Sequence, residues 1–479
     1  MNQVITLGAP DGAPRATGLT PDRITEVRLV DGTLVDLTLT AGRITGITPA
    51  ATGTAADGAP DSATAGVTLD ATGWRALPAT TEPHAHLDKA LSAERVDYFS
   101  GTTQNDLPAA IEQWSGLLES IDEEDIRSRA TRAVARYVAQ GTTTVRTHVD
   151  FPRTGDPLRG LRALVAVREA LAGVLTLQIT GLTGFHTPGS VIDDAVELGL
   201  DVLGGCPHLS PDPHHETTRV LDVAERTGLP VDLHTDEQTG TEHLDVVDLA
   251  QQVIARGLTQ RVTASHCVRL GSLPPDELRP VLDLVARAGI GIVTLPITNL
   301  YLQGWDATHL APRGLTAVRA VLDAGIPLAA GADNLRDPFN PVGRADPFET
   351  TSLLVTAGHL TPVEALAAVT TGPRTVLGLP PVLDVGPTRP AAGLWAGGPP
   401  AELPVADLVL VPDVDLGDVL AGNVGSRVVL HGGRVLADTR TAQTLDLTAP
   451  FRSTAPHDPA RTPGAPAPTA ARPALEHVR

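Results

Sequence analysis

Eight short runs of apolar, β-prone residues recur along the middle of the chain. They lie near residues 76–83, 142–149, 175–182, 202–206, 230–234, 261–265, 290–295 and 326–330. Helical patterns separate most of these runs, near residues 122–140, 160–172, 217–227, 276–288 and 316–324. Strands that alternate with helices favour an α/β fold, here a (β/α)8 TIM barrel, with a doubly wound parallel sheet as the alternative.

The clearest helical pattern is the one at residues 122–140. Its apolar residues recur at the spacing of a single helix face, as in Ile126, Ala130, Ala133, Val134, Tyr137 and Val138. Ser120 and Glu123 predict a capping box at its start.

The two chain ends share a different pattern, which is typical of β-hairpins. Residues 24–47 alternate apolar and polar side chains around Asp31-Gly32, and residues 426–438 do so around Gly432-Gly433, after a short apolar strand at 406–411. Isolated hairpins are marginally stable, so we expect both ends to join in one small β-sandwich domain. The predicted division is residues 1–75 (small β domain, with a flexible loop at 48–66), 76–383 (barrel), 384–450 (small β domain) and 451–479 (disordered tail).

The composition excludes several classes of protein. With 36 basic and 56 acidic residues the net charge is −20, which disfavours nucleic acids and anionic membranes as partners. No apolar run approaches the roughly 20 residues of a membrane span. Cys206 and Cys267 are the only cysteines, so a disulfide framework is excluded. The first residues lack a basic head followed by a long apolar stretch, and we therefore expect a cytoplasmic location.

Polar residues gather where the apolar runs stop. His84 and His86 follow the first run, His234 and Glu237 the fifth, and His266 the sixth. Asp333 and Asn334 follow the eighth run. In a barrel the carboxyl ends of all strands meet at one rim, and residues i and i+2 of a strand point to the same side. Histidines and a carboxylate converging there predict a site for one divalent metal ion, Zn or Fe.

Several stretches resemble one known superfamily. They are EPHAHLDK at 82–89, VRTHVD at 145–150, DLHTDE at 232–237, VTASH at 262–266, LYLQG at 300–304 and GADNLRDPFNPVG at 331–343. Together they resemble the amidohydrolase superfamily, and within it the cytosine deaminase-like branch. The resemblance implies a barrel with a small β domain built from both chain ends. It also implies His84, His86, His234 and Asp333 as metal ligands, Glu237 as the acid/base, and His266 as the group that orients the attacking water.

The reaction that this resemblance implies is hydrolytic deamination of a small nitrogen heterocycle, by attack of metal-bound hydroxide on an amidine-type carbon. Asp333 would accept the proton of the water, and Glu237 would protonate a ring nitrogen. Three alternatives stay open: an N-dealkylating hydrolase of an aminotriazine, as in isopropylammelide hydrolases, a cyclic-amide hydrolase, and a non-catalytic scaffold. Binuclear members carry a lysine after strand four, whereas the only lysine here is Lys89, so one metal is expected. The resemblance also allows a homo-oligomer.

Two positions depart from the cytosine deaminase pattern. Gly184 stands where those enzymes carry a glutamine, and Asn334 replaces an aspartate. A site that lacks a hydrogen-bonding partner discriminates against the substrate that needs it, so we expect cytosine to be a poor substrate. A triazine, a creatinine-like or a pterin-like compound is expected instead. Gly184, His208, Gln303 and Asn334 are the candidate substrate-binding residues. His148 is interpreted as packing at the rim or as a residue that supports the ligands, rather than as a metal ligand.

Overall fold

The apolar runs in the middle of the chain form one eight-stranded parallel sheet. Its strands are β7 (Thr80–Ala85), β8 (Thr142–Asp150), β9 (Thr176–Leu182), β10 (Val202–Gly205), β11 (Val231–Thr235), β12 (Val262–His266), β13 (Gly291–Thr294) and β14 (Leu328–Ala330). Each strand pairs with the next along the chain, and a parallel bridge between Ala85 and Asp333 brings the two edge strands together. The sheet is thus a nearly closed barrel, and the predicted fold class is confirmed.

The structure is a computed structural model. It describes residues 3–10, 12–13, 16–50, 66–96, 106–240, 243–309, 314–384, 402–422 and 424–440. The predicted loop at 48–66 lies mostly outside these ranges, and the predicted tail at 451–479 lies wholly outside them.

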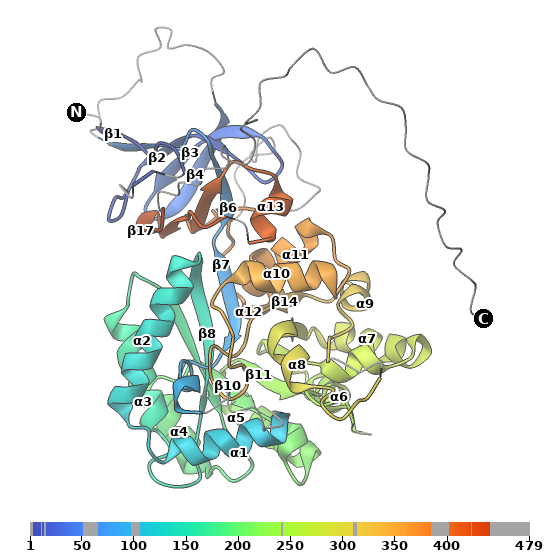
Figure 1. Ribbon diagram of the computed structural model, residues 1–479. Coiled ribbons are helices and arrows are strands. Elements are labelled where there is room, and N and C mark those ends of the chain that lie inside the picture. Colours follow the sequence, from blue (N-terminus) through green and yellow to red (C-terminus); the bar gives the residue numbers. More distant parts are fainter. Residues whose placement is uncertain are drawn as a thin grey trace, which may run out of the picture. The chain divides into compact units, whose positions relative to one another are not determined.

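Helices connect the barrel strands and cover the outside of the sheet (Figure 1). The described α-helices are α1 (Leu107–Leu118), α2 (Glu123–Ala139), α3 (Arg159–Ala170), α4 (Gly189–Glu197), α5 (Pro213–Thr227), α6 (Asp245–Arg256), α7 (Pro275–Ala288), α8 (Pro296–Leu302), α9 (Val318–Asp323), α10 (Pro347–Thr356), α11 (Pro362–Val369), α12 (Thr371–Leu377) and α13 (Leu416–Leu420). Short 3₁₀ turns occur at Ala93–Arg95, Pro207–Leu209 and Val268–Ser272. None of these helices is long and apolar enough to cross a membrane.

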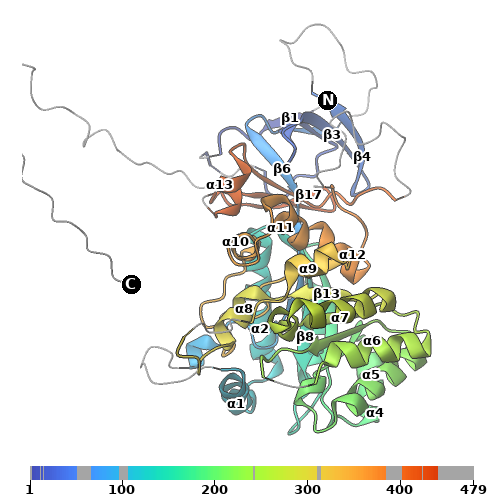
Figure 2. The same ribbon diagram turned by 90° about the vertical axis from the view of Figure 1, so that its right-hand side faces the viewer.

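The two chain ends meet in a second, mixed sheet. Its strands are β1 (Gln3–Thr6), β2 (Arg23–Arg28), β3 (Leu34–Thr40), β4 (Arg43–Pro49), β5 (Val67–Asp70), β6 (Trp74–Pro78), β15 (Leu408–Pro412), β16 (Val428–His431) and β17 (Arg434–Asp438). The antiparallel pair β6–β15 joins the N-terminal strands, blue in the figures, to the C-terminal strands, red (Figure 1 and Figure 2). Both predicted hairpins are present, and the prediction that the ends share one β unit is confirmed.

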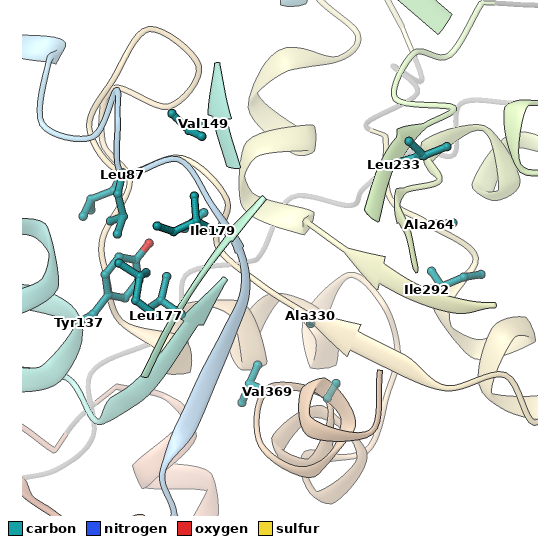
Figure 3. Packing of buried hydrophobic residues seen from close by; sticks show 14 of the residues in the cluster. Leu87, Tyr137, Val149, Leu177, Ile179, Leu233, Ala264, Ile292, Ala330 and Val369 are labelled. Carbon is teal, nitrogen blue, oxygen red and sulfur yellow. The ribbon is translucent and has the colours of Figure 1, made fainter. Parts of the chain in front are cut away.

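A large apolar cluster fills most of the space between the barrel strands and the surrounding helices, and a second, smaller one joins Val293 and Ala329 to Val376 and Leu377 of α12. Figure 3 shows part of the large cluster: Ile179 of β9, Tyr137 of α2 and Val369 of α11 belong to the same cluster as Leu233 and Ile292. Along a strand, alternate residues point outward into this cluster and inward into the barrel. In β11, Val231 and Leu233 are in the apolar cluster, which leaves Asp232 and His234 for the interior.

The barrel interior beneath the rim is polar. Arg146 Nη1 donates to Asp232 Oδ2 over 2.9 Å, and Ser265 Oγ donates to Asp232 Oδ1 over 2.7 Å. Glu82 closes the seam between β7 and β14, because its carboxylate accepts from the backbone N of His84 (3.2 Å) and of Ala332 (2.9 Å). These bonds fix the strand ends that carry the polar residues of the rim.

Two local predictions differ from the structure. The apolar run at 76–83 is divided at Ala79 between β6 of the mixed sheet and β7 of the barrel. The predicted capping box of Ser120 and Glu123 is wrong. The residue preceding α2 is Asp122, whose side chain accepts from Asp125 N, and Ser120 Oγ instead donates to Leu117 O. A carboxylate is an equally good acceptor for the first free N–H groups of a helix, and it favours the positive end of the helix dipole.

Candidate active site

Four of the predicted residues converge at the carboxyl ends of three strands. His84 Nε2 and His234 Nε2 lie 3.1 Å apart, across the barrel from β7 to β11. Asp333 Oδ1, just after β14, lies 3.3 Å from His86 Nε2 and 3.8 Å from His84 Nε2. The three histidines offer ligand atoms that all lie within 4.8 Å of one another. All four side chains are buried.

The chemistry of these donors fits a divalent metal ion. Asp333 Oδ1 is buried and has no hydrogen-bond partner in the described part of the chain, although Nε2 of His84 and Nε2 of His86 lie within 3.8 Å of it. Burial lowers the pKa of His84, His86 and His234, with further lowering from neighbouring histidines, and so keeps the rings neutral as ligands must be. Burial and nearby carboxylates raise the pKa of Asp333 well above its usual value, a cost that a cation at Oδ1 would offset.

A second group of possible ligands is less suited to a metal. His84, His148 and Asp232 also approach one another, and the rings of His84 and His148 stack with centroids 3.8 Å apart. Both oxygens of Asp232 already accept bonds, however, from Arg146 and Ser265. His148 therefore packs beside His84 below the rim, which agrees with its interpretation as a packing residue.

Two site residues reach the cluster through unusual backbone geometry. Ser265 bonds inside the barrel, so strict alternation would turn the next residue, His266, outward. The φ of His266 is +69°, a left-handed conformation, and Asp333 has a φ of +67°. For residues other than glycine this conformation costs about 1–2 kcal/mol. Such strain at a site is maintained only where the surrounding structure fixes it.

Glu237 and His266 lie together beside the histidine cluster. Glu237 Oε1 is 3.7 Å from His266 Nδ1, and Asn299 Nδ2 lies 3.1 Å from the same nitrogen. Burial alone would raise the pKa of Glu237, but His266, His208 and His234 outweigh it and lower the pKa to about 2. Glu237 is therefore ionised at neutral pH and can accept a proton.

His208 and Gln303 lie behind Glu237 rather than in the space before it. His208 Nε2 is 3.7 Å from Glu237 Oε2, and its Nδ1 is 3.3 Å from Asp245 Oδ2. Gln303 Nε2 donates to the backbone O of Glu237 over 2.6 Å. Both side chains hold the acidic residue in place, and neither is among the described residues that line the cavity.

A cavity of about 830 Å³ opens above the cluster. His86, His234, Glu237, His266 and Asp333 form one end of it. Two predicted substrate-binding residues, Gly184 and Asn334, also line it. Asn334 Nδ2 donates to Asp337 Oδ2 over 2.8 Å. At Gly184, an added Cβ would lie 2.5 Å from the ring of His186, so this imidazole occupies the place of a larger residue 184.

One wall of this cavity consists of residues that no sequence pattern indicates. It is formed by Lys89, Trp114, Asp150 and Phe339, together with the mouth residues Arg153, Phe185 and His186. Lys89 is the only lysine of the chain, and this is the one sequence feature that singles out any residue of this wall. Trp114 lies on α1 and Phe339 on a loop, and neither position stands out by spacing.

Comparisons with known proteins agree with this geometry. Residues 109–386, more than half of the chain, match the sequence profile described as the amidohydrolase family. A pterin deaminase of Rhizobium rhizogenes is 32% identical over 374 residues, which cover 75% of this chain and 80% of that protein.

Two solved structures extend the likeness to the whole fold. The structure of 5-methylcytosine deaminase from Klebsiella pneumoniae liganded with 5-fluorocytosine is 28% identical with a TM-score of 0.74, covering 89% of this chain and 100% of the other. N-isopropylammelide isopropylaminohydrolase from Burkholderia multivorans is 26% identical with a TM-score of 0.69, covering 88% and 100%.

Together with the barrel and the cavity, these likenesses show a hydrolase that acts on C–N bonds. The chain belongs to the amidohydrolase family.

Proposed function

We propose that this protein is a metal-dependent deaminase that removes the amino group of a pterin-type heterocycle as ammonia. The observation that carries the proposal is the position of Glu237. It stands beside the histidine–aspartate cluster and lines the same cavity. The similarity to a pterin deaminase over four fifths of that protein's length supports the substrate class.

We assign His84, His86, His234 and Asp333 as the ligands of one divalent metal ion. A divalent cation at such a site supplies an activated water, because it lowers the pKa of that water towards neutrality. Asp333 Oδ2 can accept a hydrogen bond from this water and hold its proton. His266 Nε2, buried and without a partner in the described residues, is free to bond the same water and fix its direction.

Glu237 moves the proton that the reaction needs. It begins as a carboxylate and accepts a proton from the attacking water. It then donates that proton to a ring nitrogen, where the proton stays, and this makes the neighbouring amidine carbon a better electrophile. The second proton of the water passes through Asp333 to the leaving amine. The balance is one water consumed and one ammonia released, with a C=O group formed where the C–NH2 group stood.

The cavity favours a bicyclic substrate over a single pyrimidine ring. Its volume of about 830 Å³ lies in the upper part of the range for small-molecule sites, and aromatic rings of Trp114, Phe185 and Phe339 line it. Gly184 offers no side chain to read a pyrimidine edge, and Asn334 is engaged with Asp337. These features support the expectation that cytosine is a poor substrate.

A second candidate is N-dealkylation of an aminotriazine, which differs only in the amine that leaves. The likeness to an isopropylaminohydrolase of the same fold favours it, although the identity is lower. No described residue at the cluster distinguishes an alkylamine from ammonia as the leaving group.

The test is release of amine from a panel of substrates. Protein loaded with Zn²⁺ or Fe²⁺ is incubated with pterin, isocytosine, cytosine, creatinine and N-isopropylammelide, and ammonia and isopropylamine are quantified. We expect ammonia from pterin at a kcat/KM at least tenfold above that for cytosine, and at least 100-fold less from the Asp333→Asn variant. Isopropylamine as the main product would favour the second candidate, and no release from any compound would reject both.

A further inference from the structure

The cavity that Glu237 lines also has a buried ion pair in its wall. Lys89 Nζ lies 3.0 Å from Asp150 Oδ2, and the side chain of Lys89 is only 4% exposed. The ammonium also faces the rings of Trp114 and Phe339, whose centroids are 5.4 and 4.9 Å away. Burial opposes the charge, but Asp150 and Asp88 outweigh it and raise the pKa of Lys89 above its usual value. Asp150 therefore has a permanent counter-ion.

Asp150 is held firmly on one side only. Its Oδ2 accepts a second bond, from Trp114 Nε1 over 2.6 Å, and its backbone N donates to Asp88 Oδ2 over 3.0 Å. None of the described residues donates to Oδ1. The side chain is 19% exposed and lines the cavity. Asp150 thus presents one oriented carboxylate oxygen, an acceptor only, to whatever occupies the cavity.

Asp150 and Glu237 approach this space from different parts of the rim. Asp150 ends β8, whereas Glu237 follows β11, three strands further along the sheet. A flat ring placed between them would meet an acid/base at one edge and a fixed acceptor at another. The rings of Trp114 and Phe339, which line the cavity beside Lys89, suit the face of such a ring.

We propose that Asp150 is a substrate-reading residue whose Oδ1 accepts a hydrogen bond from a ring N–H of the heterocycle, with Lys89 and Trp114 as its positioning residues. This inference rests on the proposed function and names the substrate feature that the site selects. A ring that offers an N–H at this edge is bound, and a ring that offers a lone pair or an N-methyl group there is rejected. Hydrogen bonds to a charged group contribute about 1.5–3 kcal/mol, which corresponds to roughly 10- to 150-fold in affinity.

The experiment compares the binding of lumazine and 3-methyllumazine to the metal-loaded protein by fluorescence titration. Lumazine is the deaminated form of pterin, so binding is measured without turnover. We expect the wild type to prefer lumazine by at least tenfold and Asp150→Asn to reduce this preference below threefold. An equal affinity of the wild type for both compounds, no binding of either, or an unchanged preference in Asp150→Asn would overturn the proposal.

Asp346→Asn is the matched control. Asp346 is 16% exposed and forms an ion pair with Arg427 at 3.0 Å, outside the described lining of this cavity. Asp346→Asn should lower the melting temperature and keep the wild-type preference for lumazine over 3-methyllumazine. If Asp150→Asn loses its circular dichroism signal, Asp150→Glu takes its place, and an unchanged preference again contradicts the proposal.

Ammonia release from pterin separates this inference from the proposed function. A preference for lumazine without ammonia release would reject the reaction but keep the recognition by Asp150. Ammonia release by a protein that binds lumazine and 3-methyllumazine equally would keep the reaction and reject the recognition by Asp150.

Discussion

The Nε2 atoms of His84 and His234 lie 3.1 Å apart, although their strands β7 and β11 are separated by three others in the sheet. Both rings are buried, and their Nε2 atoms are close enough to be ligands of one ion, with Asp333 Oδ1 3.8 Å from His84 Nε2. With the ring protons on Nδ1 both histidines offer an Nε2 lone pair to a cation, whereas without a cation a proton on one Nε2 makes the pair a hydrogen bond. The metal-binding assignment rests on this contact.

Loss of either imidazole should therefore abolish metal binding. We expect His234→Ala to retain less than about 0.1 metal ion per chain after dialysis, against about one for the wild type, because the variant loses one of the four assigned ligands, the imidazole that faces His84 across the barrel. Elemental analysis by mass spectrometry gives the ratio. His215→Ala, at an exposed position of α5, is the control and should keep the wild-type metal content. An unchanged content in His234→Ala would contradict the ligand assignment.

Replacement of the acid/base should separate metal binding from turnover. Glu237→Gln keeps the size of the side chain but cannot carry the proton, and general acid–base catalysis typically contributes 10²–10⁴-fold. We expect kcat for pterin to fall by about that factor while the metal content stays near one per chain. Stopped assays of ammonia together with elemental analysis test this. A kcat within threefold of the wild type would exclude Glu237 from proton transfer.

Restoring the aspartate of the cytosine deaminase pattern should destabilise this chain. Asn334→Asp would set a second carboxylate 2.8 Å from Asp337 Oδ2, where the amide now donates. The loss of that bond and the burial of two like charges should cost about 1–3 kcal/mol. Urea denaturation of Asn334→Asp measures the cost, and the double variant with Asp337→Asn should recover most of it. No recovery in the double variant would show that the two residues are not coupled.

The same contacts limit how cytosine activity can be gained. Gly184→Gln must displace the ring of His186, which lies 2.5 Å from an added Cβ. The double variant Gly184→Gln/Asn334→Asp therefore fits only if His186 and Asp337 change position. We expect a gain of cytosine turnover only when His186 and Asp337 are substituted as well.

His208 should make folding stability depend on pH. Burial opposes its protonation, but the carboxylates of Asp245 and Glu237 outweigh burial and raise its pKa to about 9. The folded-state pKa exceeds the unfolded value of about 6.5, so the stabilising contribution is complete below pH 6.5 and is lost as the pH rises through 9. The melting temperature of the wild type should fall by several degrees between pH 6.5 and 9.5. His208→Gln should be less stable at pH 6.5 and lose most of this decline; parallel curves would contradict the assignment.

The periodicity of the sequence was sufficient to predict the barrel strands, because buried parallel strands are short apolar runs bounded by helices. Each predicted run overlaps an observed strand, and the motif spacing brought His84, His86, His234 and Asp333 to one rim. The placement of His266 in the site could not be predicted from alternation, since it depends on a left-handed backbone at that residue.

The residues of the cavity wall could not be predicted from the sequence, for a different physical reason. Lys89, Asp150 and Trp114 meet through tertiary contacts between a loop, a strand end and a helix that no local pattern connects. His208 shows the same limit: its position after β10 suggested a substrate contact, whereas its carboxylate partners hold it behind Glu237. Spacing predicts which residues reach the rim, but the side-chain partners determine which of them face the cavity.

The most direct test is a metal titration of the metal-free protein, followed by ammonia release from pterin. The protein is stripped with a chelator and titrated separately with Zn²⁺ and Fe²⁺, and the initial rate is plotted against metal ions per chain. We predict no activity in the stripped protein and a rate that rises linearly to a plateau at one equivalent. A plateau at two equivalents would contradict the single-metal site of His84, His86, His234 and Asp333, and full activity without metal would contradict the proposed chemistry altogether.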